Sequence, residues 1–327
     1  ALTYVKNSFI IILGYQVYEY KRDLITGLLL LILLLRRMFI MLMNMKELLS
    51  VANKANFAVP AFNVSDYSMF RGLMEITEEL NAPIIIAIHP DELKHTGPWL
   101  LSAIKERLYQ SPVPSVIHLD HGASIEQILY GIQCGFTSVM IDGSSLPFEE
   151  NIALCKKVCE IAHPVNVSVE GELGTIGTAD NFGEAGAKVI KYTDPQDAKT
   201  LIERSGIDCL AVAIGTCHGI YPKGVDPKLR LDILKDIKAA VPETPLVLHG
   251  GSANPDSEIG ESVTLGINKI NISSDIKVAY FEKMREVLQD KNVREPNVIQ
   301  PSCIEAMKEL AAHKIRLFQA DGKASLY

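Results

Sequence analysis

Cysteine is scarce in this sequence of 327 residues, and its few copies form no recognisable framework. The six cysteines include no C-x-x-C pair, and four lie within apolar or helical stretches, where a reduced thiol packs as a small hydrophobic side chain. This scarcity argues against a disulfide-stapled secreted domain and indicates a cytoplasmic protein. Cys217 is disfavoured as a catalytic thiolate, because nothing else in the sequence indicates an acyl-transfer site.

An excess of basic residues is also missing. The chain holds 32 Lys and Arg against 39 Asp and Glu, a net charge of -7. Residues 1–44 contain five basic and two acidic residues, so the remainder has 27 basic against 37 acidic residues, a net charge of -10. An acidic body of this kind disfavours nucleic acid as a partner.

The sequence also lacks an uninterrupted apolar run that would span a bilayer comfortably. Leu24 to Leu35 is almost wholly apolar, but Arg36 and Arg37 end it. Basic residues precede this block, as in a signal or anchor, yet no small-residue cleavage site follows it. We therefore expect residues 1–44 to be a hydrophobic N-terminal extension, and a start at Met45 would mark it as a non-native leader. Membrane association is disfavoured.

Residues 45–327 contain no linker-like or low-complexity stretch, which indicates a single domain. Eight short β-branched runs alternate there with longer amphipathic stretches. This alternation predicts an α/β fold, a (β/α)8 or TIM barrel, whose strands are apolar because both faces are buried. The predicted strands are Phe57 to Val64, Pro83 to Ile88, Ser115 to Leu119, Ser138 to Ile141, Val165 to Val169, Cys209 to Ile214, Pro245 to Leu248 and Ile267 to Ile272.

The amphipathic stretches predict the helices between these strands. Apolar residues recur at helical spacing from Tyr67 to Leu80, behind Asp66 as a candidate N-cap. Further helices are predicted over Ser124 to Gln133, Glu149 to Ile161, Pro195 to Ser205, Leu229 to Ala240, Val278 to Gln289 and Cys303 to Phe318. Polar and glycine residues gather where the predicted strands end, which is the face on which this fold builds its active sites.

Three of the apolar runs end in His-Gly, at His121, His218 and His249. They follow predicted strands three, six and seven, so a closed barrel points all three imidazoles into one mouth. Three neutral imidazoles with a fourth position open to substrate are typical of catalytic zinc. The sequence therefore predicts a Zn²⁺ cofactor.

Three acids lie near these ligands in the predicted fold. Asp142 and Glu172, after strands four and five, are expected to orient imidazoles or to hold the metal in an alternative position, although each could instead be a helix N-cap or an ion-pair partner. Asp120 precedes a metal ligand and is the candidate general acid and base. The alternative for Asp120 is a carboxylate that only neutralises metal charge.

A phosphate site is predicted beside the metal. Gly250-Gly251-Ser252 and Ile272-Ser273-Ser274 follow strands seven and eight, whose loops most often hold phosphate in barrels, although the glycines could serve only as tight turns. Metal, carboxylate and phosphate together predict aldol cleavage or condensation, in which zinc polarises a carbonyl while Asp120 moves a proton at a neighbouring hydroxyl. An imine mechanism would need a lysine in a barrel strand, and the one candidate, Lys269, is expected to be structural.

From about Met45 to near the C-terminus, the sequence resembles the class II, zinc-dependent ketose-bisphosphate aldolases, which include fructose- and tagatose-bisphosphate aldolases. The motifs that carry the resemblance are A-F-N at Ala61 to Asn63, H-L-D-H-G at His118 to Gly122, E-G-E-L-G at Glu170 to Gly174, Y-T-D-P at Tyr192 to Pro195, A-I-G-T-C-H-G-I-Y at Ala213 to Tyr221, L-H-G-G-S at Leu248 to Ser252 and N-I-S-S-D at Asn271 to Asp275.

The resemblance implies a lyase of carbohydrate metabolism and glycolysis, a homodimer or homotetramer, that splits a ketose 1,6-bisphosphate into dihydroxyacetone phosphate and glyceraldehyde 3-phosphate. It implies that Asp120 exchanges the C4 hydroxyl proton and that an acid between Thr175 and Lys191 exchanges the triose proton. Asp180 and Glu184 are both candidates for this acid, with Glu184 the preferred assignment. The implied metal residues are His121, His218, His249, Asp142 and Glu172, and the implied substrate contacts are Asn63, Gly219, Gly250, Gly251, Ser252, Asn271, Ile272, Ser273 and Ser274, with Asn271 also catalytic.

The sequence departs from the family pattern in two places. Where relatives commonly have Gly-Gly followed by an acid, this chain has Gly177 to Asp180. After strand two, where many relatives place Gly, Ser or Thr near the distal phosphate, it has Ile88 to Asp91. The sequence therefore leaves two alternatives: a class II aldolase for another phosphorylated sugar, or a catalytically silent barrel that binds sugar phosphates.

Overall fold

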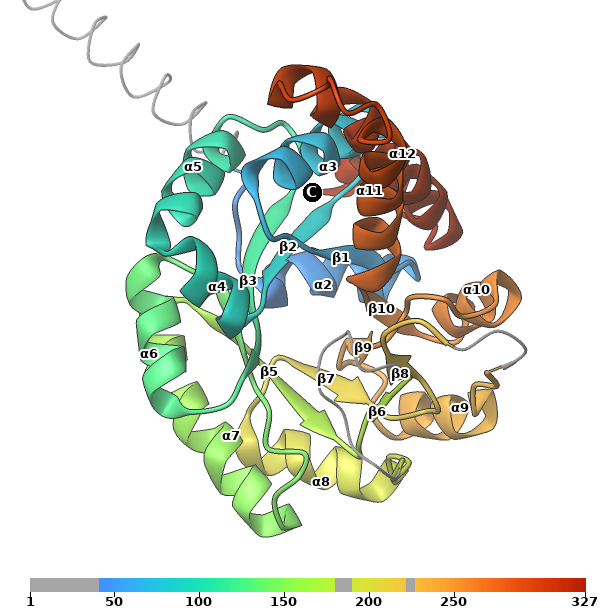
Figure 1. Ribbon diagram of the computed structural model, residues 1–327. Coiled ribbons are helices and arrows are strands. Elements are labelled where there is room, and N and C mark those ends of the chain that lie inside the picture. Colours follow the sequence, from blue (N-terminus) through green and yellow to red (C-terminus); the bar gives the residue numbers. More distant parts are fainter. Residues whose placement is uncertain (1–40, 180–189, 222–226) are drawn as a thin grey trace, which may run out of the picture. The chain divides into compact units, whose positions relative to one another are not determined.

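Eight parallel strands form a closed barrel, in the order β1-β10-β9-β7-β5-β4-β3-β2. The computed structural model describes residues 41–179, 190–221 and 227–327, of which the region from Met41 to Tyr327 forms one compact unit. Figure 1 shows the strands ringed by helices, which confirms the predicted (β/α)8 barrel. The strands are β1 (Val59–Asn63), β2 (Ile84–Ile88), β3 (Ser115–Gly122), β4 (Ser138–Ile141), β5 (Ser168–Leu173), β7 (Cys209–Val212), β9 (Leu246–Leu248) and β10 (Ile267–Ile272).

Buried side chains, most of them apolar, cover both faces of the strands. Every residue of β2 is buried, and its register with β3 runs without interruption from Ile84 opposite Ser115 to Ile88 opposite Leu119. The first and last strands close the barrel, with Val59 opposite Lys269. The carboxyl ends of all eight strands therefore lie at one mouth.

The helices begin at caps that the sequence supplies. Asp66 accepts a hydrogen bond from the Met69 amide at 2.8 Å, and Asp194 accepts from Gln196 and Asp197. The helices are α3 (Tyr67–Glu79), α4 (Pro90–Thr96), α5 (Pro98–Tyr109), α6 (Ile125–Cys134), α7 (Phe148–Ala162), α8 (Pro195–Ser205), α9 (Leu231–Ala240), α10 (Asp256–Thr264), α11 (Ser274–Val287) and α12 (Pro296–Leu317). The 3-10 turns are η1 (His163–Val165) and η2 (Lys323–Leu326).

An additional helix, α2 (Met45–Ala55), packs against β3, β5, β7 and β10. The Lys46 amide donates to Ser168 Oγ at 3.0 Å, and Lys46 Nζ lies 3.1 Å from Asp208 Oδ1, so the helix sits at the amino ends of β5 and β7. Apolar residues such as Leu48 and Leu49 are fully buried on its inner face. The helix thus closes the end of the barrel opposite the mouth.

The prediction for strand five was wrong in its limits. Residues 163–165 form η1, and β5 begins at Ser168 and continues to Leu173. Glu170 and Glu172 therefore lie within a buried strand and not after it. The charge of Glu170 is compensated there by Lys269, which is distant in sequence. The helices α2, α4, α5 and α10 were also not predicted.

A two-stranded sheet lies at the mouth. Its strands, β6 (Gly177–Thr178) and β8 (Cys217–His218), come from the loops after β5 and β7. The Ala179 amide donates to the His218 carbonyl oxygen at 2.7 Å. Among residues 41–179, 190–221 and 227–327, no helix has both the length and the apolar character needed to cross a bilayer. The predicted extension lies outside these residues over positions 1–40.

Candidate metal and phosphate site

The end of β3 delivers two adjacent polar residues to the barrel mouth. Side chains normally alternate between the two faces of a strand. Here the pairing of β3 with β4 shifts register between Leu119 and Gly122, and His121 has a left-handed φ of 50°. This conformation costs a non-glycine residue about 1 kcal/mol or more. It brings both Asp120 and His121 into the site.

The structure brings the three predicted histidines together. One ligand atom from each of His121, His218 and His249 lies within 4.8 Å of the others. The ring centroids of His121 and His249 are 4.6 Å apart, and those of His121 and His218 are 5.1 Å apart. His121 belongs to β3, His218 to β8, and His249 directly follows β9.

Carboxylates fix the orientation of two of these rings. His121 Nδ1 lies 3.3 Å from Asp142 Oδ2, and His249 Nε2 lies 2.8 Å from Glu170 Oε1. Because a carboxylate accepts hydrogen bonds, these two nitrogens carry protons. The remaining nitrogens, His121 Nε2 and His249 Nδ1, are 2.8 Å apart. This separation requires either a proton between the two nitrogens, which gives His121 a positive charge, or a cation that both nitrogens bind.

The protonation of the site favours a cation as well. Burial lowers the pKa of His249, and the His121 and Lys269 charges lower it further, which keeps the ring neutral and able to bind metal. The same donor set fits Zn²⁺, which binds neutral imidazoles whose second nitrogen donates to a carboxylate.

A second group of potential ligands shares His121 with two acids. Ligand atoms of His121, Asp142 and Glu172 also lie within 4.8 Å of one another. Burial raises the pKa of Glu172 to about 8, and the Asp142 charge contributes to this rise. Within the described part of the chain, Glu172 Oε2 is buried without a hydrogen-bond partner. An ion near His121 would stabilise this carboxylate.

Asp120 is fully buried between two asparagines. Asn63 Nδ2 donates to Oδ2 at 2.8 Å, and Asn271 Nδ2 donates to both carboxylate oxygens at 3.0 and 3.1 Å. Burial alone would raise the pKa of Asp120, but the surrounding charges of His121 and Lys269 hold it well below its usual range. Asp120 is therefore an ionised carboxylate whose two oxygens are held in place by hydrogen bonds. Counting only described residues, Asn63 Oδ1 and Asn271 Oδ1 remain buried acceptors without a partner.

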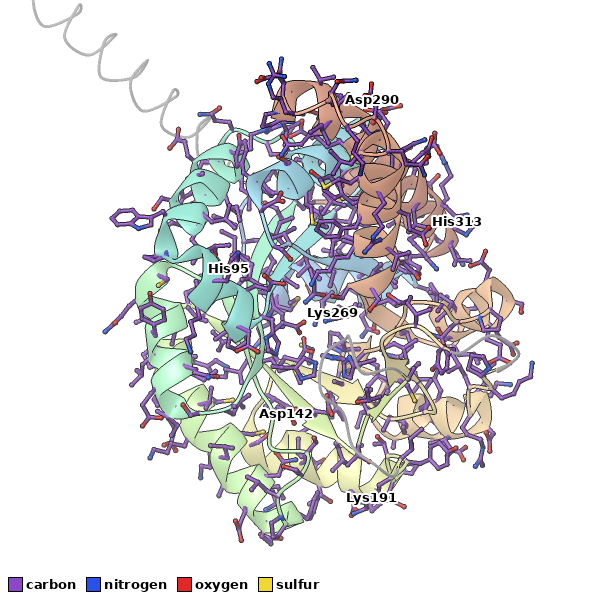
Figure 2. The ribbon with its side chains drawn as sticks, viewed as in Figure 1. His95, Asp142, Lys191, Lys269, Asp290 and His313 are labelled. Atoms are coloured by element: carbon purple, nitrogen blue, oxygen red, sulfur yellow. The ribbon has the colours of Figure 1, made fainter. Side chains whose placement is uncertain are left out.

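Lys269 is a fully buried residue of β10, labelled near the middle of the ring of strands in Figure 2. Its Nζ lies 2.7 and 3.0 Å from the two oxygens of Glu170, and both residues are fully buried. Burial and the Lys269 charge lower the pKa of the adjacent His118 to about 3, so this ring is neutral. Lys269 is thus committed to an ion pair that supports the carboxylate behind His249, as expected for a structural lysine.

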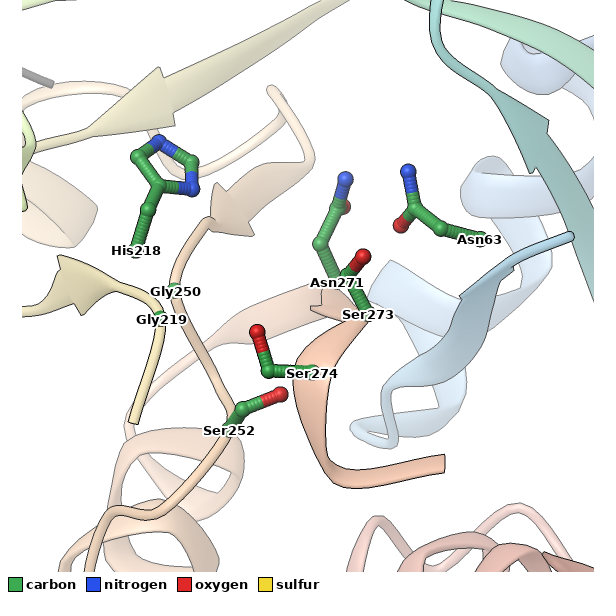
Figure 3. Close-up of a pocket in the computed structure, with 8 residues that line it drawn as sticks. All are labelled: Asn63, His218, Gly219, Gly250, Ser252, Asn271, Ser273 and Ser274. Carbon is green, nitrogen blue, oxygen red and sulfur yellow. The ribbon is translucent and has the colours of Figure 1, made fainter. Parts of the chain in front are cut away.

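A small polar pocket adjoins the histidines. It is lined by Asn63, His218, Gly219, Gly250, Ser252, Asn271, Ser273 and Ser274. Figure 3 shows His218 across the pocket from Asn63 and Asn271, with the three serines along one side. Gly250 has a φ of 61°, and a Cβ there would lie 2.5 Å from the Cys217 carbonyl oxygen, so only glycine fits.

Ser273 and Ser274 line the pocket at the start of α11, and the N-terminus of a helix favours an anion, so the pocket suits a phosphate group.

Two residues predicted to contact substrate do not line this pocket. The Gly251 amide donates to the Asn271 carbonyl oxygen at 3.1 Å, and Ile272 is buried in β10. Gly251 is nevertheless sterically required, because a Cβ would lie 2.8 Å from the same carbonyl oxygen. The two candidate loop acids, Asp180 and Glu184, lie outside the described residues.

Sequence reasoning assigned Glu170 no role at the metal. Glu170 belongs to the E-G-E-L-G motif, which marked it as a candidate site residue. Its partners His249 and Lys269 lie 79 and 99 residues away, so the sequence did not indicate what it contacts.

Known proteins resemble the chain over this whole region. A family model described as Fructose-bisphosphate aldolase class-II matches residues 43–323. A fructose-bisphosphate aldolase from Staphylococcus aureus is 38% identical over 288 residues, which cover 86% of this chain and 99% of that protein. The structure of the YdjI aldolase from Escherichia coli K12 has a TM-score of 0.77 and 34% identity, covering 86% of this chain and 99% of that chain. The fructose-bisphosphate aldolase of Campylobacter jejuni shares the fold, with a TM-score of 0.73 and 24% identity over 86% of this chain and 97% of its own.

Proposed function

The chain belongs to the class II fructose-bisphosphate aldolase family, a family of zinc-dependent lyases, and we propose that it reversibly cleaves a ketose 1,6-bisphosphate into dihydroxyacetone phosphate and glyceraldehyde 3-phosphate. The observation that carries this proposal is the convergence of His121, His218 and His249 beside the buried carboxylate of Asp120. The three histidines would hold the zinc ion. When bound there, zinc supplies a Lewis acid that polarises the substrate carbonyl.

Asp120 is the group that moves the C4 hydroxyl proton. In cleavage its ionised carboxylate accepts this proton, and in condensation it returns it. Asn63 and Asn271 hold the carboxylate by three hydrogen bonds, so its oxygens keep one position through both steps. Their own carbonyl oxygens provide acceptors for substrate hydroxyl groups.

The polar pocket holds the phosphate of the dihydroxyacetone half. Gly219 and Gly250 allow the backbone to approach the anion closely, while Ser252, Ser273 and Ser274 offer hydroxyl groups. Gly251 and Ile272 act by fixing the backbone around them. Asp142 orients His121, and Glu172 is an alternative metal ligand beside it. We also propose Glu184, or alternatively Asp180, as the acid that exchanges the triose proton.

The test is an assay of fructose and tagatose 1,6-bisphosphate cleavage by purified enzyme before chelation, after chelation and after return of Zn²⁺. We expect activity to disappear and return with the metal. His218→Ala should lose both zinc and turnover, whereas Asp120→Ala should keep zinc and lose turnover. His313→Ala is the matched control, because His313 is an exposed histidine on α12, paired with Asp256. Activity that is indifferent to chelation would overturn the zinc mechanism.

Fructose 1,6-bisphosphate is the favoured sugar, because the Staphylococcus aureus relative is a fructose-bisphosphate aldolase. A second candidate, another phosphorylated sugar, is favoured by His89. Its ring lies at the end of β2 with its centroid 6.4 Å from that of His121, and its Nδ1 accepts a hydrogen bond from the Asp91 amide. An imidazole here changes the surface that meets the part of the sugar distal to the metal.

A condensation assay separates these candidates. Dihydroxyacetone phosphate is offered with glyceraldehyde 3-phosphate and with a panel of unphosphorylated aldehydes, using wild type and His89→Ser. A preference for glyceraldehyde 3-phosphate by wild type supports the bisphosphate substrate. A preference for another aldehyde, reversed by His89→Ser, supports the second candidate.

We further propose that the protein works in the cytoplasm as a homodimer or homotetramer. All six cysteines are free thiols, and four of them are buried, which supports a reducing compartment. Cell fractionation and light scattering of the purified protein test these two points, and a monomer or a membrane-bound pool would contradict them.

A further inference from the structure

One carboxylate joins the two loops that form the phosphate pocket. The Ala253 amide donates to both oxygens of Asp275, at 3.1 and 3.2 Å, and the Asp275 amide donates to Ser252 Oγ at 3.2 Å. Ser252 and Ala253 belong to the loop after β9, whereas Asp275 lies in the first turn of α11. Asp275 thus sets the spacing between the two groups of residues that line the pocket.

A buried lysine compensates the charge of this carboxylate. Lys314 Nζ lies 3.2 Å from Asp275 Oδ2, and its side chain is 5% exposed. Its other acidic neighbour, Asp256, is 3.9 Å away and accepts from His313 at 2.7 Å. The ammonium group of Lys314 is therefore directed mainly to Asp275. It reaches the site from α12, outside every motif that carries the family resemblance.

The negative charge of Asp275 would weaken the binding of an anion nearby unless a positive charge compensates it. Asp275, whose amide contacts Ser252 Oγ, would repel a phosphate group bound at that serine, and at partly buried positions such repulsion is poorly screened. Lys314 cancels this repulsion while leaving the oxygens of Asp275 available to the Ala253 amide. A neutral residue at position 275 would avoid the repulsion but would weaken the bond that holds the loop.

We propose that Lys314 is a positioning residue for phosphate recognition, which neutralises Asp275 and thereby holds the loop after β9 against α11. The inference rests on the proposed function, since it takes the polar pocket as the phosphate site. It assigns to α12 a part in substrate affinity, although no residue of this helix lines the pocket.

The experiment compares zinc-loaded wild type with Lys314→Met, Lys314→Arg and the double variant Asp275→Asn/Lys314→Met. The readouts are KM and kcat for fructose 1,6-bisphosphate, the inhibition constant of inorganic phosphate, and zinc content. Lys308→Met is the matched control, because Lys308 is an ion-paired lysine on the same helix that pairs with Glu75 and Glu305.

Lys314→Met should raise KM and the phosphate inhibition constant about tenfold, the order expected when one compensating charge near an anion is removed at a partly solvated site. Its kcat and zinc content should stay near the wild-type values. Lys314→Arg should recover most of the affinity. The double variant should bind phosphate more tightly than Lys314→Met, because the uncompensated carboxylate is gone, whereas a purely structural role predicts equal or weaker binding.

Each failure has its own signature. If wild type cleaves the sugar and is inhibited by phosphate, and Lys314→Met has the same KM and the same phosphate inhibition constant, the role of Lys314 is overturned while the proposed function stands. If Lys314→Met does not fold, the comparison of wild type with Lys314→Arg and the double variant decides, and a double variant that binds no phosphate overturns the charge argument. If wild type shows no cleavage, the proposed function fails, and the phosphate affinities, measured by calorimetry, still test Lys314.

Discussion

Replacing Lys269 by Met tests how the barrel supports its metal site. The substitution keeps the length of the side chain and removes its charge. Both members of the Lys269–Glu170 pair are fully buried, and two contacts of 2.7 and 3.0 Å join them. Removing one partner of such a pair leaves an uncompensated buried charge and costs about 3–5 kcal/mol. We expect this loss in the free energy of unfolding at pH 7.5.

Urea unfolding of the metal-free protein, followed by circular dichroism, measures the loss without a contribution from bound zinc. The double variant Lys269→Met/Glu170→Gln should lose less than Lys269→Met alone, because no charge remains unpaired. Lys308→Met removes a more exposed pair from α12 and should change the free energy by no more than about 1 kcal/mol. A loss below about 1 kcal/mol for Lys269→Met would refute the argument.

The same experiment has a defined pH dependence. Burial by itself would raise the pKa of Glu170, but the charge of Lys269 and the hydrogen bond from His249 outweigh burial and hold the pKa below its ordinary value of 4.5. A depressed pKa stabilises the fold above the unfolded value and loses this contribution as the pH falls through the native pKa. In Lys269→Met the compensating charge is gone, so burial raises the pKa of Glu170 and the carboxylate can take up a proton. The difference between wild type and variant should therefore shrink as the pH falls from 7.5 toward 4, because Glu170 in the variant is then protonated and no longer an unpaired buried charge.

Three further predictions follow from the site. Asp120→Asn should lower kcat at least about 100-fold with little change in zinc content, as measured by steady-state kinetics and metal analysis, since proton transfer by a positioned carboxylate contributes that much. Glu170→Gln should weaken zinc binding about 10–100-fold in a competition with a chromophoric chelator, and unchanged affinity would show that the partner of the imidazole is unimportant. Gly250→Ala should raise KM because its φ of 61° and the nearby carbonyl group exclude a Cβ. Gly206→Ala is its control, since Gly206 also has a positive φ, 80°, but has open space around it, and equal KM values for the two variants would contradict the steric argument.

The barrel and its mouth were predictable because they depend on local patterns. Apolar runs such as Ile84 to Ile88 indicate buried strands, and parallel strands in a closed barrel must end at one face. Three histidines that each follow such a run are therefore brought together by topology alone. Where each ring would point was not predictable, because His121 depends on a register shift and a left-handed φ.

The limits of β5 and the compensation of its charges were not predictable by the same reasoning. Glu170 and Glu172 resemble residues that follow a strand, because an unpaired carboxylate is costly inside a barrel. Only the fold shows that Lys269, 99 residues later, faces Glu170. Helices α4 and α5 were missed for a simpler reason, since the segment after β2 has a short and irregular apolar pattern, with α5 carrying buried residues only at Leu101, Ile104 and Leu108.

Lys269 and Lys314 have the same physical role in two places: each lies beside a carboxylate that is largely removed from solvent. A cation site of this kind places a carboxylate behind its imidazoles, and the anion site uses a carboxylate to join its two loops. The first carboxylate is fully buried and the second is 14% exposed, so each is stabilised by a nearby positive charge. Lys269 neutralises Glu170 behind His249, inside the ring of strands. Lys314 neutralises Asp275 behind Ser252, between the outer helices. Because the two pairs share no residue, we expect Lys269→Met to act mainly on metal affinity and Lys314→Met mainly on phosphate affinity.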